Sequence, residues 1–562
     1  MVGFDAHYLN SGRRVMVSIA AQHTASATAL AEKHRMRRDV SWWQVVFIAA
    51  GAPALVMFNL GGISAVTGTI SPLVWTCSVL LGFMELFIYA EIAGLHPSKS
   101  GGTAVHGATA WVRYSKIIAP MSIWSNWLAW SPILAIGSGL ASGYLLSIFV
   151  PPDHPINTWQ ITLLNLNSIQ PDLTVRINAQ FIIGTIIMLA IWSVQHTGIG
   201  RTARAAVLLT VASLIPLLFV TIIPIFTGRI DWNNFTPFVP LNGAWDLAGW
   251  RLFFGGLMLA AWSAYAAETA VCYMSEFKDP AKDAPKAIIW SGIVCIALYV
   301  LVPFVFQGVL GTQYMMKPSI VSGEGVGVAL ASMVNAGPFA TKLIVAILTF
   351  TLLLGILTAM AGSSRTLYEG GRDGWMPKYL SHLNKHGIPT YAMWTDLAFN
   401  AMLLLMSNYL FVLAVSSVNY ILFHYLNLNA GWIHRIDNPE VNRPYWAPKP
   451  AFIIGCCLGF FNAFLIGAGS DVWGPSILFL GLLSAFISVP VFYYRHYIVD
   501  KGKFPDDMLS DLWPEGATDV GPTKAGNLPY IALAGGALFC ALGYVIFWSG
   551  LFIPPTLPPA PS

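Results

Sequence analysis

The chain has 562 residues, of which 56% are hydrophobic and only 10% are charged, and its formal net charge at pH 7 is +4. Ordinary soluble domains carry charged side chains at about 25% of their positions, so this composition excludes a typical soluble protein. All six cysteines lie within apolar runs, which argues against a disulfide framework or a metal-binding cysteine cluster. The basic residues flank apolar runs and form no patch suited to nucleic acid.

Apolar runs long enough to cross a bilayer recur along the whole sequence, which predicts an all-α polytopic membrane protein. We place thirteen spans, in chain order, at residues 42–66, 71–95, 117–150, 178–199, 203–227, 247–275, 286–310, 338–363, 390–407, 409–432, 451–469, 473–498 and 528–553. Residues 499–527 are expected to form a cytosolic loop, and residues 554–562 a short tail outside.

The distribution of positive charge predicts the orientation. Residues 1–41 form a basic tail that lacks a signal-peptide core, so we expect it to be retained in the cytosol. With this tail inside, only five of the 30 Lys and Arg residues fall on the outer side, namely Arg176, Arg229, Arg251, Lys317 and Lys342. Because basic residues concentrate in cytoplasmic segments, this asymmetry supports a plasma or inner membrane protein with a cytosolic amino terminus.

The first and sixth predicted spans both carry unusual residues near the middle of the bilayer. In the first span, Pro53 follows Gly51 and Ala52 and is expected to break or kink the helix, although a simple proline kink is the alternative. In the sixth span, Trp262 lies about 16 Å from Arg251 along the helix axis, near mid-membrane. Interrupted helices at corresponding positions of two halves indicate a transporter's binding site.

Four sequence motifs resemble those of the amino acid–polyamine–organocation (APC) permease superfamily over roughly residues 42–498. The first is residues 89–93 (YAEIA) with the following proline and residues 100–102 (SGG). In the second, Glu268 precedes Pro280 by twelve residues, with Asp279 replacing the usual asparagine. The third comprises residues 364–368 (SRTLY) and 372–377 (RDGWMP), and the fourth is residues 443–448 (RPYWAP).

The resemblance implies a LeuT-like fold built from five-plus-five inverted repeats. Residues 42–227 would form the first repeat (spans 1–5) and residues 247–432 the second (spans 6–10), followed by accessory spans 11 and 12 (residues 451–498) and a thirteenth span at 528–553. Members of this superfamily move amino acids, amines and related organic cations by alternating access, using proton or sodium coupling or exchange. The substrate would lie between helices one and six, with walls from helices three, eight and ten.

The substrate site implied by the resemblance comprises Gly51, Ala52, Pro53, Ala54, Leu55, Trp262, Ser263, Tyr265 and Ala266. Two of these positions depart from the family pattern. Pro53 has no N–H group, so a contact with a substrate carboxylate would shift to the amides of Ala54 and Leu55. Ala266 replaces a glycine, which reduces the space for close approach of the backbone. Trp262 is interpreted as a gate that closes over the substrate, with plain packing as the alternative. Tyr265 would donate its hydroxyl to the ligand or to a backbone carbonyl.

Two carboxylates in the spans, Glu268 and Glu85, are candidates for carrying a coupling proton. A charged group near mid-membrane costs about 2.5–3.5 kcal/mol on the insertion scale, so such residues usually have a function or a partner. The alternative for each is a structural hydrogen bond inside the bundle. Hydroxyls of the eighth span (Thr351, Thr358, Ser363 and Ser364) would be needed for sodium, but these also bond back to their own helix. We therefore favour a proton over sodium.

We predict a secondary transporter of amino acids or related amines that contacts membrane lipid, rather than an enzyme, with no cofactor, metal or nucleic acid. Two alternatives are a membrane-embedded enzyme acting on lipid-type substrates and a nutrient sensor that binds its ligand without moving it. The glycine-rich outer segment 311–337 either caps an outer vestibule or is a simple connector.

Overall fold

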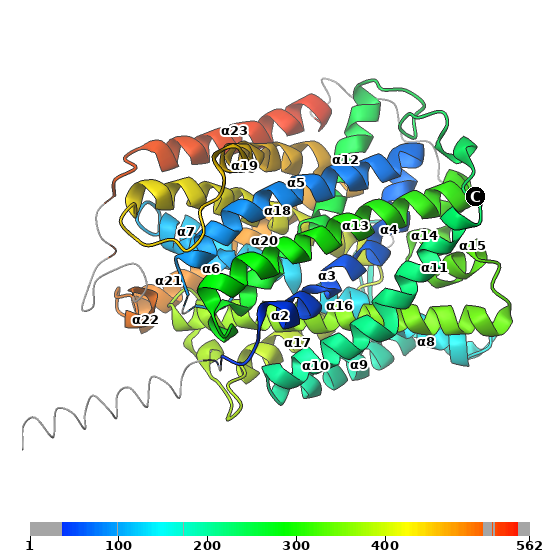
Figure 1. Cartoon of the computed structure of the whole chain (residues 1–562), viewed down its shortest axis with the longest axis horizontal. Coiled ribbons are helices and arrows are strands. Elements are labelled where there is room, and N and C mark those ends of the chain that lie inside the picture. Colours follow the sequence, from blue (N-terminus) through cyan, green and yellow to red (C-terminus); the bar gives the residue numbers. More distant parts are fainter. Residues whose placement is uncertain are drawn as a thin grey trace, which may run out of the picture.

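The structure is a computed structural model that describes residues 36, 38–97, 99–171, 173–509, 520 and 523–548. Most of the predicted basic tail, the middle of the 499–527 loop, the end of the thirteenth predicted span and the carboxyl-terminal tail lie outside these residues. The fold is predominantly helical, and the long helices run side by side through one bundle (Figure 1).

The first half of the chain contains the helices that correspond to the first five predicted spans. In chain order the elements are α2 (Trp42–Ala49), α3 (Gly51–Ala54), α4 (Val56–Thr67), η1 (Gly68–Ile70), α5 (Ser71–Gly94), α6 (Thr103–Trp111), α7 (Ile118–Trp130), α8 (Ile133–Phe149), η2 (Pro155–Asn157), β1 (Gln160–Asn165), β2 (Thr174–Asn178), α9 (Ala179–His196), α10 (Ile199–Leu209), η3 (Thr210–Leu214) and α11 (Ile215–Phe226).

The second half continues with η4 (Trp232–Phe235), α12 (Leu247–Ala264), η5 (Ala266–Glu276), α13 (Pro280–Met315), α14 (Pro318–Val321), α15 (Val326–Met333), α16 (Pro338–Arg372), η6 (Lys378–Ser381), α17 (Thr390–Leu404) and α18 (Tyr409–Asp437). The remaining elements are α19 (Lys449–Gly469), η7 (Ser470–Trp473), α20 (Ile477–Phe486), α21 (Ser488–Tyr493), η8 (Tyr494–Val499), α22 (Asp506–Leu509) and α23 (Leu528–Trp548).

Among the described residues, eleven helical segments are long and apolar enough to cross a membrane. The segment Trp42–Gly94 has 53 residues and contains the first two predicted spans. The ninth predicted span corresponds to α17, which has only 15 residues and is not one of the eleven. The chain is therefore a multi-pass helical membrane protein, and the total of thirteen spans stays a prediction.

Two helices extend beyond the predicted spans. Helix α16 continues past residue 363 through the SRTLY motif to Arg372, with no proline to stop it. Helix α13 begins before residue 286, since Pro280 occupies its first turn, where the missing N–H costs no hydrogen bond. The all-α prediction missed a hairpin, in which β1 pairs antiparallel with β2.

Short polar side chains cap the first turns of two long helices, α12 and α18. The Asn408 side chain accepts a hydrogen bond from the amide of Phe411 (3.1 Å) and begins α18 directly after the 403–407 segment. Asp246 accepts from the amide of Gly249 (2.8 Å) and begins α12, and these hydrogen bonds hold the pKa of Asp246 below its usual value. Such side-chain caps satisfy amides that have no partner within the helix.

Candidate functional site

The first predicted span is interrupted at two positions around Pro53. Ala50 separates α2 from α3, and Leu55 separates α3 from α4. Both residues keep right-handed backbone angles, and the amide of Leu55 donates to the carbonyl of Ala52 (3.0 Å), three residues earlier. The helix is therefore tightened at these turns rather than unwound, which is how it accommodates the missing N–H group of Pro53.

Close packing against α16 explains the glycine before this proline. A Cβ atom on Gly51 would overlap the Thr358 hydroxyl and the Leu354 carbonyl oxygen. The Thr358 hydroxyl in turn donates to the carbonyl oxygen of Ile48, at the end of α2. Gly51 through Ala54 are buried. The eighth predicted span thus covers the interruption and satisfies one of its carbonyl groups.

The sixth predicted span is interrupted at Tyr265. The α-helix α12 ends at Ala264, and the chain continues after Tyr265 as the tighter 3₁₀ helix η5. Gly82 of α5 allows the break to lie close to the second span, because a Cβ atom there would come within 2.6 Å of the Tyr265 ring. The sixth predicted span, residues 247–275, therefore corresponds to one helical segment, Leu247–Glu276, that changes its helix type at Tyr265.

One hydroxyl group joins the two interruptions. The Tyr299 hydroxyl, on α13, lies 2.6 Å from the carbonyl oxygen of Ala52 and 2.8 Å from that of Ser263. Because it has one hydrogen to donate, it serves either carbonyl or both in a shared bond. Tyr299 is fully buried and stacks on Trp75 at 5.3 Å. The first and sixth helices therefore meet at a buried polar contact.

Trp262 lies above this contact and is held by two other helices. Its indole N–H is 2.9 Å from the Ser416 hydroxyl on α18 and 3.1 Å from the Ala129 carbonyl oxygen on α7. Its ring centroid lies 6.3 Å from that of Phe58 on α4. Trp262 thus contacts the first, third and tenth predicted spans from the sixth.

The Tyr265 hydroxyl, expected to donate to the ligand or to a backbone carbonyl, donates to a side chain in this structure. The Tyr265 ring lies 4.9 Å from that of His424 on α18, and its hydroxyl donates to the Asn462 side chain on α19 (3.4 Å). The structure therefore brings Tyr265 together with the second, tenth and eleventh predicted spans. Ser263 and Ala266 are buried beside it at the break.

Glu85 forms the centre of this cluster. Its carboxylate accepts from the Asn462 amide (2.8 Å) and contacts Nδ1 of His424. The Tyr89 hydroxyl lies 2.6 Å from the same His424 nitrogen. Nε2 of His424 has no hydrogen-bond partner among the described residues, although the ring is fully buried. Glu85 is thus partnered by a histidine far away in the sequence.

Glu268 lies at the start of η5 and is also fully buried. Its Oε1 atom accepts from the Trp130 indole (2.8 Å) and from the Tyr420 hydroxyl (3.1 Å). Its Oε2 atom has no hydrogen-bond partner in the described part of the chain and faces Gly102 of the SGG motif. The Tyr420 ring contacts His424 at 4.4 Å, so Tyr420 connects the surroundings of the two carboxylates.

A third buried carboxylate, Asp396 on α17, escaped the sequence analysis. It accepts from the hydroxyls of Ser131 and Ser363, both at 2.5 Å, and from the indole N–H of Trp127 at 2.9 Å. The signal that could have identified Asp396 is its position as a single acidic residue inside an apolar run. Because three donors satisfy it, Asp396 ties helices three, eight and nine together.

Each hydroxyl considered as a sodium ligand donates a hydrogen bond inside the bundle. Thr351 and Ser364 bond back to their own helix, at 3.2 Å from Ile347 O and 3.3 Å from Ala361 O. Thr358 and Ser363 donate to α2 and to Asp396, as described above. No group of three or more His, Cys, Asp or Glu side chains suited to a metal occurs within the described residues.

Residues of the four sequence motifs are joined by ion pairs. Glu91 accepts two hydrogen bonds from Arg435 (2.6 and 2.8 Å) and lies 3.5 Å from Arg443 of the RPYWAP motif. Lys99 pairs with Asp373 of the RDGWMP motif at 2.7 Å. Arg365 of the SRTLY motif pairs with Glu276 at the end of η5. These ion pairs link segments far apart in the sequence.

Beside these pairs, α6 carries a buried histidine. The His106 ring stacks on His96 at 4.7 Å, and neither of its nitrogens has a hydrogen-bond partner among the described residues. Burial, together with the nearby His96, Lys99 and His434, lowers the pKa of His106 well below its usual value of 6.5. His106 is therefore neutral at physiological pH.

Interrupted helices that meet at a buried polar centre are the architecture of secondary transporters among multi-pass membrane proteins. The chain belongs to the amino acid permease family, whose model matches residues 40–487. The resemblance carried by the four motifs is thereby confirmed. The family consists of permeases, which also supports the prediction that the chain is not an enzyme.

Individual relatives are distant. The branched-chain amino acid permease BcaP of Lactococcus lactis subsp. cremoris is 26% identical over 280 residues, which cover 49% of this chain and 57% of that protein. BcaP of Bacillus subtilis is 29% identical over 215 residues, or 37% of this chain and 42% of that protein. The lysine-specific permease LysP of L. lactis is 27% identical over 369 residues, covering 61% of this chain and 64% of that protein. The chain thus spans about half the length of the first two relatives.

Proposed function

We propose that this chain is a secondary active transporter that moves amino acids or related amines across the membrane by alternating access, coupled to protons or by exchange. Family membership supports transport of this substrate class. The relatives include permeases for branched-chain amino acids and for lysine, which point to α-amino acids but not to one side chain.

The finer architecture belongs to the same proposal. Residues 42–227 and 247–432 form two inverted repeats of five spans, and spans 11, 12 and 13 are accessory. The amino terminus is cytosolic, and the protein resides in a plasma or inner membrane. The matching interruptions at Ala50–Leu55 and at Tyr265 support this assignment, because they fall in the first span of each repeat.

The substrate lies between residues 51–55 and 262–266, with Trp262 as the gate. Residues 51–55 and 262–266 are buried, so access for a substrate requires neighbouring elements to move apart. Opening to one side requires the inner ion pairs to separate, and opening to the other requires the Trp262–Phe58 contact to separate. Alternating access consists of these two changes taken in turn.

Glu268 and Glu85 carry the coupling proton. Both are fully buried, and each lies beside a buried polar atom that has no partner among the described residues, Oε2 in Glu268 itself and Nε2 in the neighbouring His424. A buried carboxylate and a buried imidazole exchange a proton with little change in net charge. Sodium remains the second candidate for the driving ion.

The single observation that carries the proposal is the Tyr299 bridge between the carbonyls of Ala52 and Ser263. One buried side chain thus contacts a backbone carbonyl at each of the two interruptions. A structural kink in one helix alone would not require a partner break in the sixth helix at the same place.

The test is reconstitution of the full chain in sealed vesicles, with a labelled panel that includes leucine, isoleucine, valine, lysine and small amines. We expect uptake of at least one α-amino acid, which an imposed pH gradient accelerates. Uptake or exchange that ignores the gradient would remove the coupling roles of Glu268 and Glu85. Binding without any flux would identify a sensor, and neither binding nor flux across the panel would overturn the proposal.

A further inference from the structure

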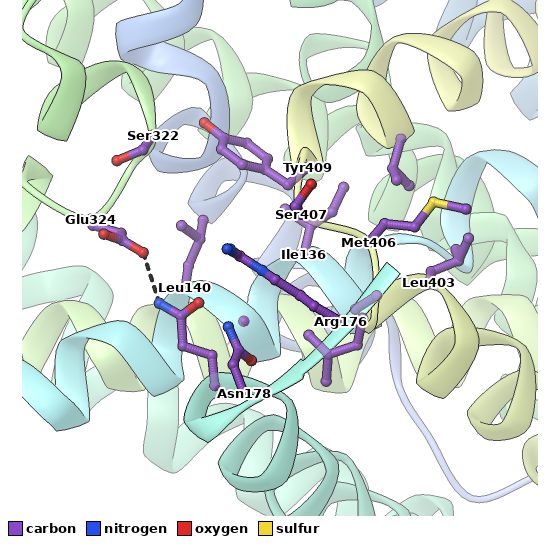
Figure 2. A pocket seen from close by; sticks show the side chains of 15 residues that line it. Ile136, Leu140, Arg176, Asn178, Ser322, Glu324, Leu403, Met406, Ser407 and Tyr409 are labelled. Carbon is purple, nitrogen blue, oxygen red and sulfur yellow. Dashed lines mark hydrogen bonds between the residues drawn. The ribbon is translucent and has the colours of Figure 1, made fainter. Parts of the chain in front are cut away.

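A cavity of about 220 Å³ lies beside the strand β2, on the predicted outer side of the bundle, and is lined by polar and apolar side chains. Figure 2 shows these side chains. The walls of the cavity come from α8, the strand β2, the segment that joins α17 to α18, and the loop after α14. An adjoining hollow of about 610 Å³ shares Arg176, Asn178, Gln180 and Glu324 with it. A cavity of this size is smaller than the ~300–1,000 Å³ of pockets for drug-sized ligands, so it fits a small molecule.

Backbone pairing holds Arg176 in this cavity. The amide of Arg176 donates to the carbonyl of Leu405 (2.8 Å), and Thr174 and Ser407 exchange two further hydrogen bonds at 2.8 and 2.9 Å. The strand β2 is thereby attached to the segment that precedes α18. Figure 2 shows the Arg176 side chain extending from the strand across the cavity, with Glu324 on the far side.

Glu324 is held by an equally well anchored loop. The carbonyl oxygen of Gly323, which has a φ of +76°, accepts from the Tyr144 hydroxyl at 2.5 Å. The Tyr409 hydroxyl lies 2.7 Å from the Val321 carbonyl oxygen. A Cβ atom on Gly61 of the first span would overlap Ile320, so this loop packs directly on α4. The segment predicted as either a cap or a connector therefore covers the first span.

The two charged groups face the cavity with only neutral partners. Arg176 donates to the side-chain oxygen of Gln160 (2.8 Å), and Glu324 accepts from the Gln180 amide (2.7 Å). Neither forms an ion pair within the described residues. A guanidinium has five N–H donors and a carboxylate has several acceptor positions, so each retains capacity for a ligand of opposite charge.

A cation and an anion across one small cavity match a molecule that carries both charges. We propose that this cavity is a separate outer binding site for one free zwitterionic α-amino acid, with Arg176 binding the carboxylate and Glu324 the ammonium group. Asn178, Ser322 and Ser407 supply further polar groups, and Ile136, Leu140, Leu403 and Val412 form an apolar part of the wall. The site therefore recognises the α-amino acid backbone and accepts an apolar side chain.

The cavity lies on the outer approach to the central site. Tyr409, which lines it, has its hydroxyl 3.1 Å from the carbonyl oxygen of Phe58. Phe58 in turn contacts Trp262. An amino acid bound between Arg176 and Glu324 is thus separated from the central site by the Phe58–Trp262 contact. The outer site loads the transporter while that gate is closed, an inference that rests on the proposed function.

The test uses the purified full chain and labelled leucine. Leucine is chosen because its apolar side chain suits the apolar part of the cavity wall. Equilibrium binding should give two leucine molecules per chain in the wild type, and one after Arg176→Gln or Glu324→Gln. In vesicles with the outer face exposed, both variants should raise the KM for uptake roughly tenfold to hundredfold, as expected for loss of one charge-assisted contact, with little change in the maximal rate. Leucinamide, which lacks the carboxylate, should bind equally to the wild type and Arg176→Gln.

Arg229→Gln is the matched control, because Arg229 is another outer arginine, and it donates to the Met333 carbonyl oxygen (2.9 Å) outside the cavity. Its KM should be unchanged. Arg176→Lys keeps the positive charge and should retain part of the affinity for leucine. This result would exclude misfolding as the reason why Arg176→Gln loses affinity. If the wild type transports leucine but binds a single molecule, or if Arg176→Gln leaves the KM unaltered, the outer site is overturned and the proposed function stands.

If leucine binding depends on Arg176 while no flux of any amino acid occurs, the proposed function fails and the outer site stands. If neither binding nor flux is detected with any amino acid, both are overturned.

Discussion

At the scale of single residues, the central site is defined by side chains that connect helices distant in the sequence. Trp262 contacts α7 and α18 through one N–H group, and Glu268 accepts hydrogen bonds from the same two helices. A movement of helix six relative to helices three and ten would change all of these contacts together. Trp262 and Glu268, six residues apart, thus share the helices that they contact.

Replacing Glu268 with glutamine separates coupling from binding. The side-chain oxygen of glutamine still accepts from Trp130 and Tyr420, so we expect the fold to persist, but the residue cannot take up a proton. Uptake driven by a pH gradient should fall at least about tenfold, while exchange of labelled for unlabelled substrate continues. Vesicle uptake and counterflow measure the two quantities.

The control is Glu440→Gln, which neutralises an exposed acid that pairs with Lys524 at 3.2 Å in the inner loops. It should leave both activities unchanged. Gradient-driven uptake that survives Glu268→Gln would exclude Glu268 as the proton carrier.

Removal of the Trp262 indole should impair transport more than folding. Trp262→Ala removes the contact with Phe58 and leaves Ser416 without its donor, so the outer closure is lost. We expect the maximal transport rate to fall about tenfold or more while the purified protein remains monodisperse. Trp262→Phe, which keeps an aromatic ring, should recover part of the rate. Normal transport by Trp262→Ala would show that this residue is packing and not a gate.

At the scale of elements, the interrupted first and sixth helices are supported by α13 and α16. Tyr299 satisfies carbonyl groups at both interruptions, and Thr358 satisfies one more at the end of α2. Because an unpaired carbonyl inside a membrane protein is costly, these hydroxyls permit irregular backbone at this depth.

Tyr299→Phe tests this support. Loss of the hydroxyl removes the one hydrogen that the carbonyls of Ala52 and Ser263 share, although Ala52 keeps the amide of Leu55, so we expect a destabilisation of about 0.5–1.5 kcal/mol. We expect a lower unfolding temperature and altered transport kinetics. Tyr379→Phe, which removes a hydroxyl from an exposed side chain that contacts Thr395, should change neither. Equal behaviour of the two variants would contradict the bridging role of Tyr299.

The short helix α6 should make stability sensitive to acid. Burial lowers the pKa of His106 well below 6.5, so the folded chain prefers the neutral ring. The resulting stabilisation is fully present above pH about 6.5 and is lost as the pH falls toward the lower folded-state value. The unfolding temperature of the wild type should therefore decrease between pH 7 and pH 5. His106→Phe should flatten this dependence, and an unchanged slope would exclude His106 as its source.

The sequence predicted elements well and the directions of side chains poorly. Pro53 in an apolar run was sufficient to place the first interruption, and the motif around Glu268 placed the sixth helix. The orientation of Tyr265 depends on where α5 and α19 pack, and no local pattern encodes that. For the same reason, the contact between Glu85 and His424, which are 339 residues apart, could not be predicted from the sequence.

At the scale of the whole molecule, the proposed function predicts that the two sides of the central site are closed by different chemistry. On the predicted inner side lie buried ion pairs, including Lys99 with Asp373 and Arg365 with Glu276. On the predicted outer side lie the Phe58–Trp262 contact and the loop anchored by Tyr144 and Tyr409. A transporter with this division should open inward by separating charges and outward by separating aromatic surfaces.

The most direct test of the account is a structure of the purified full chain bound to the amino acid that gives the highest flux in vesicles. We predict that this ligand lies between residues 51–55 and 262–266, beneath Trp262. A ligand found only elsewhere, with the first helix continuous and packed against the sixth at Pro53, would contradict the account.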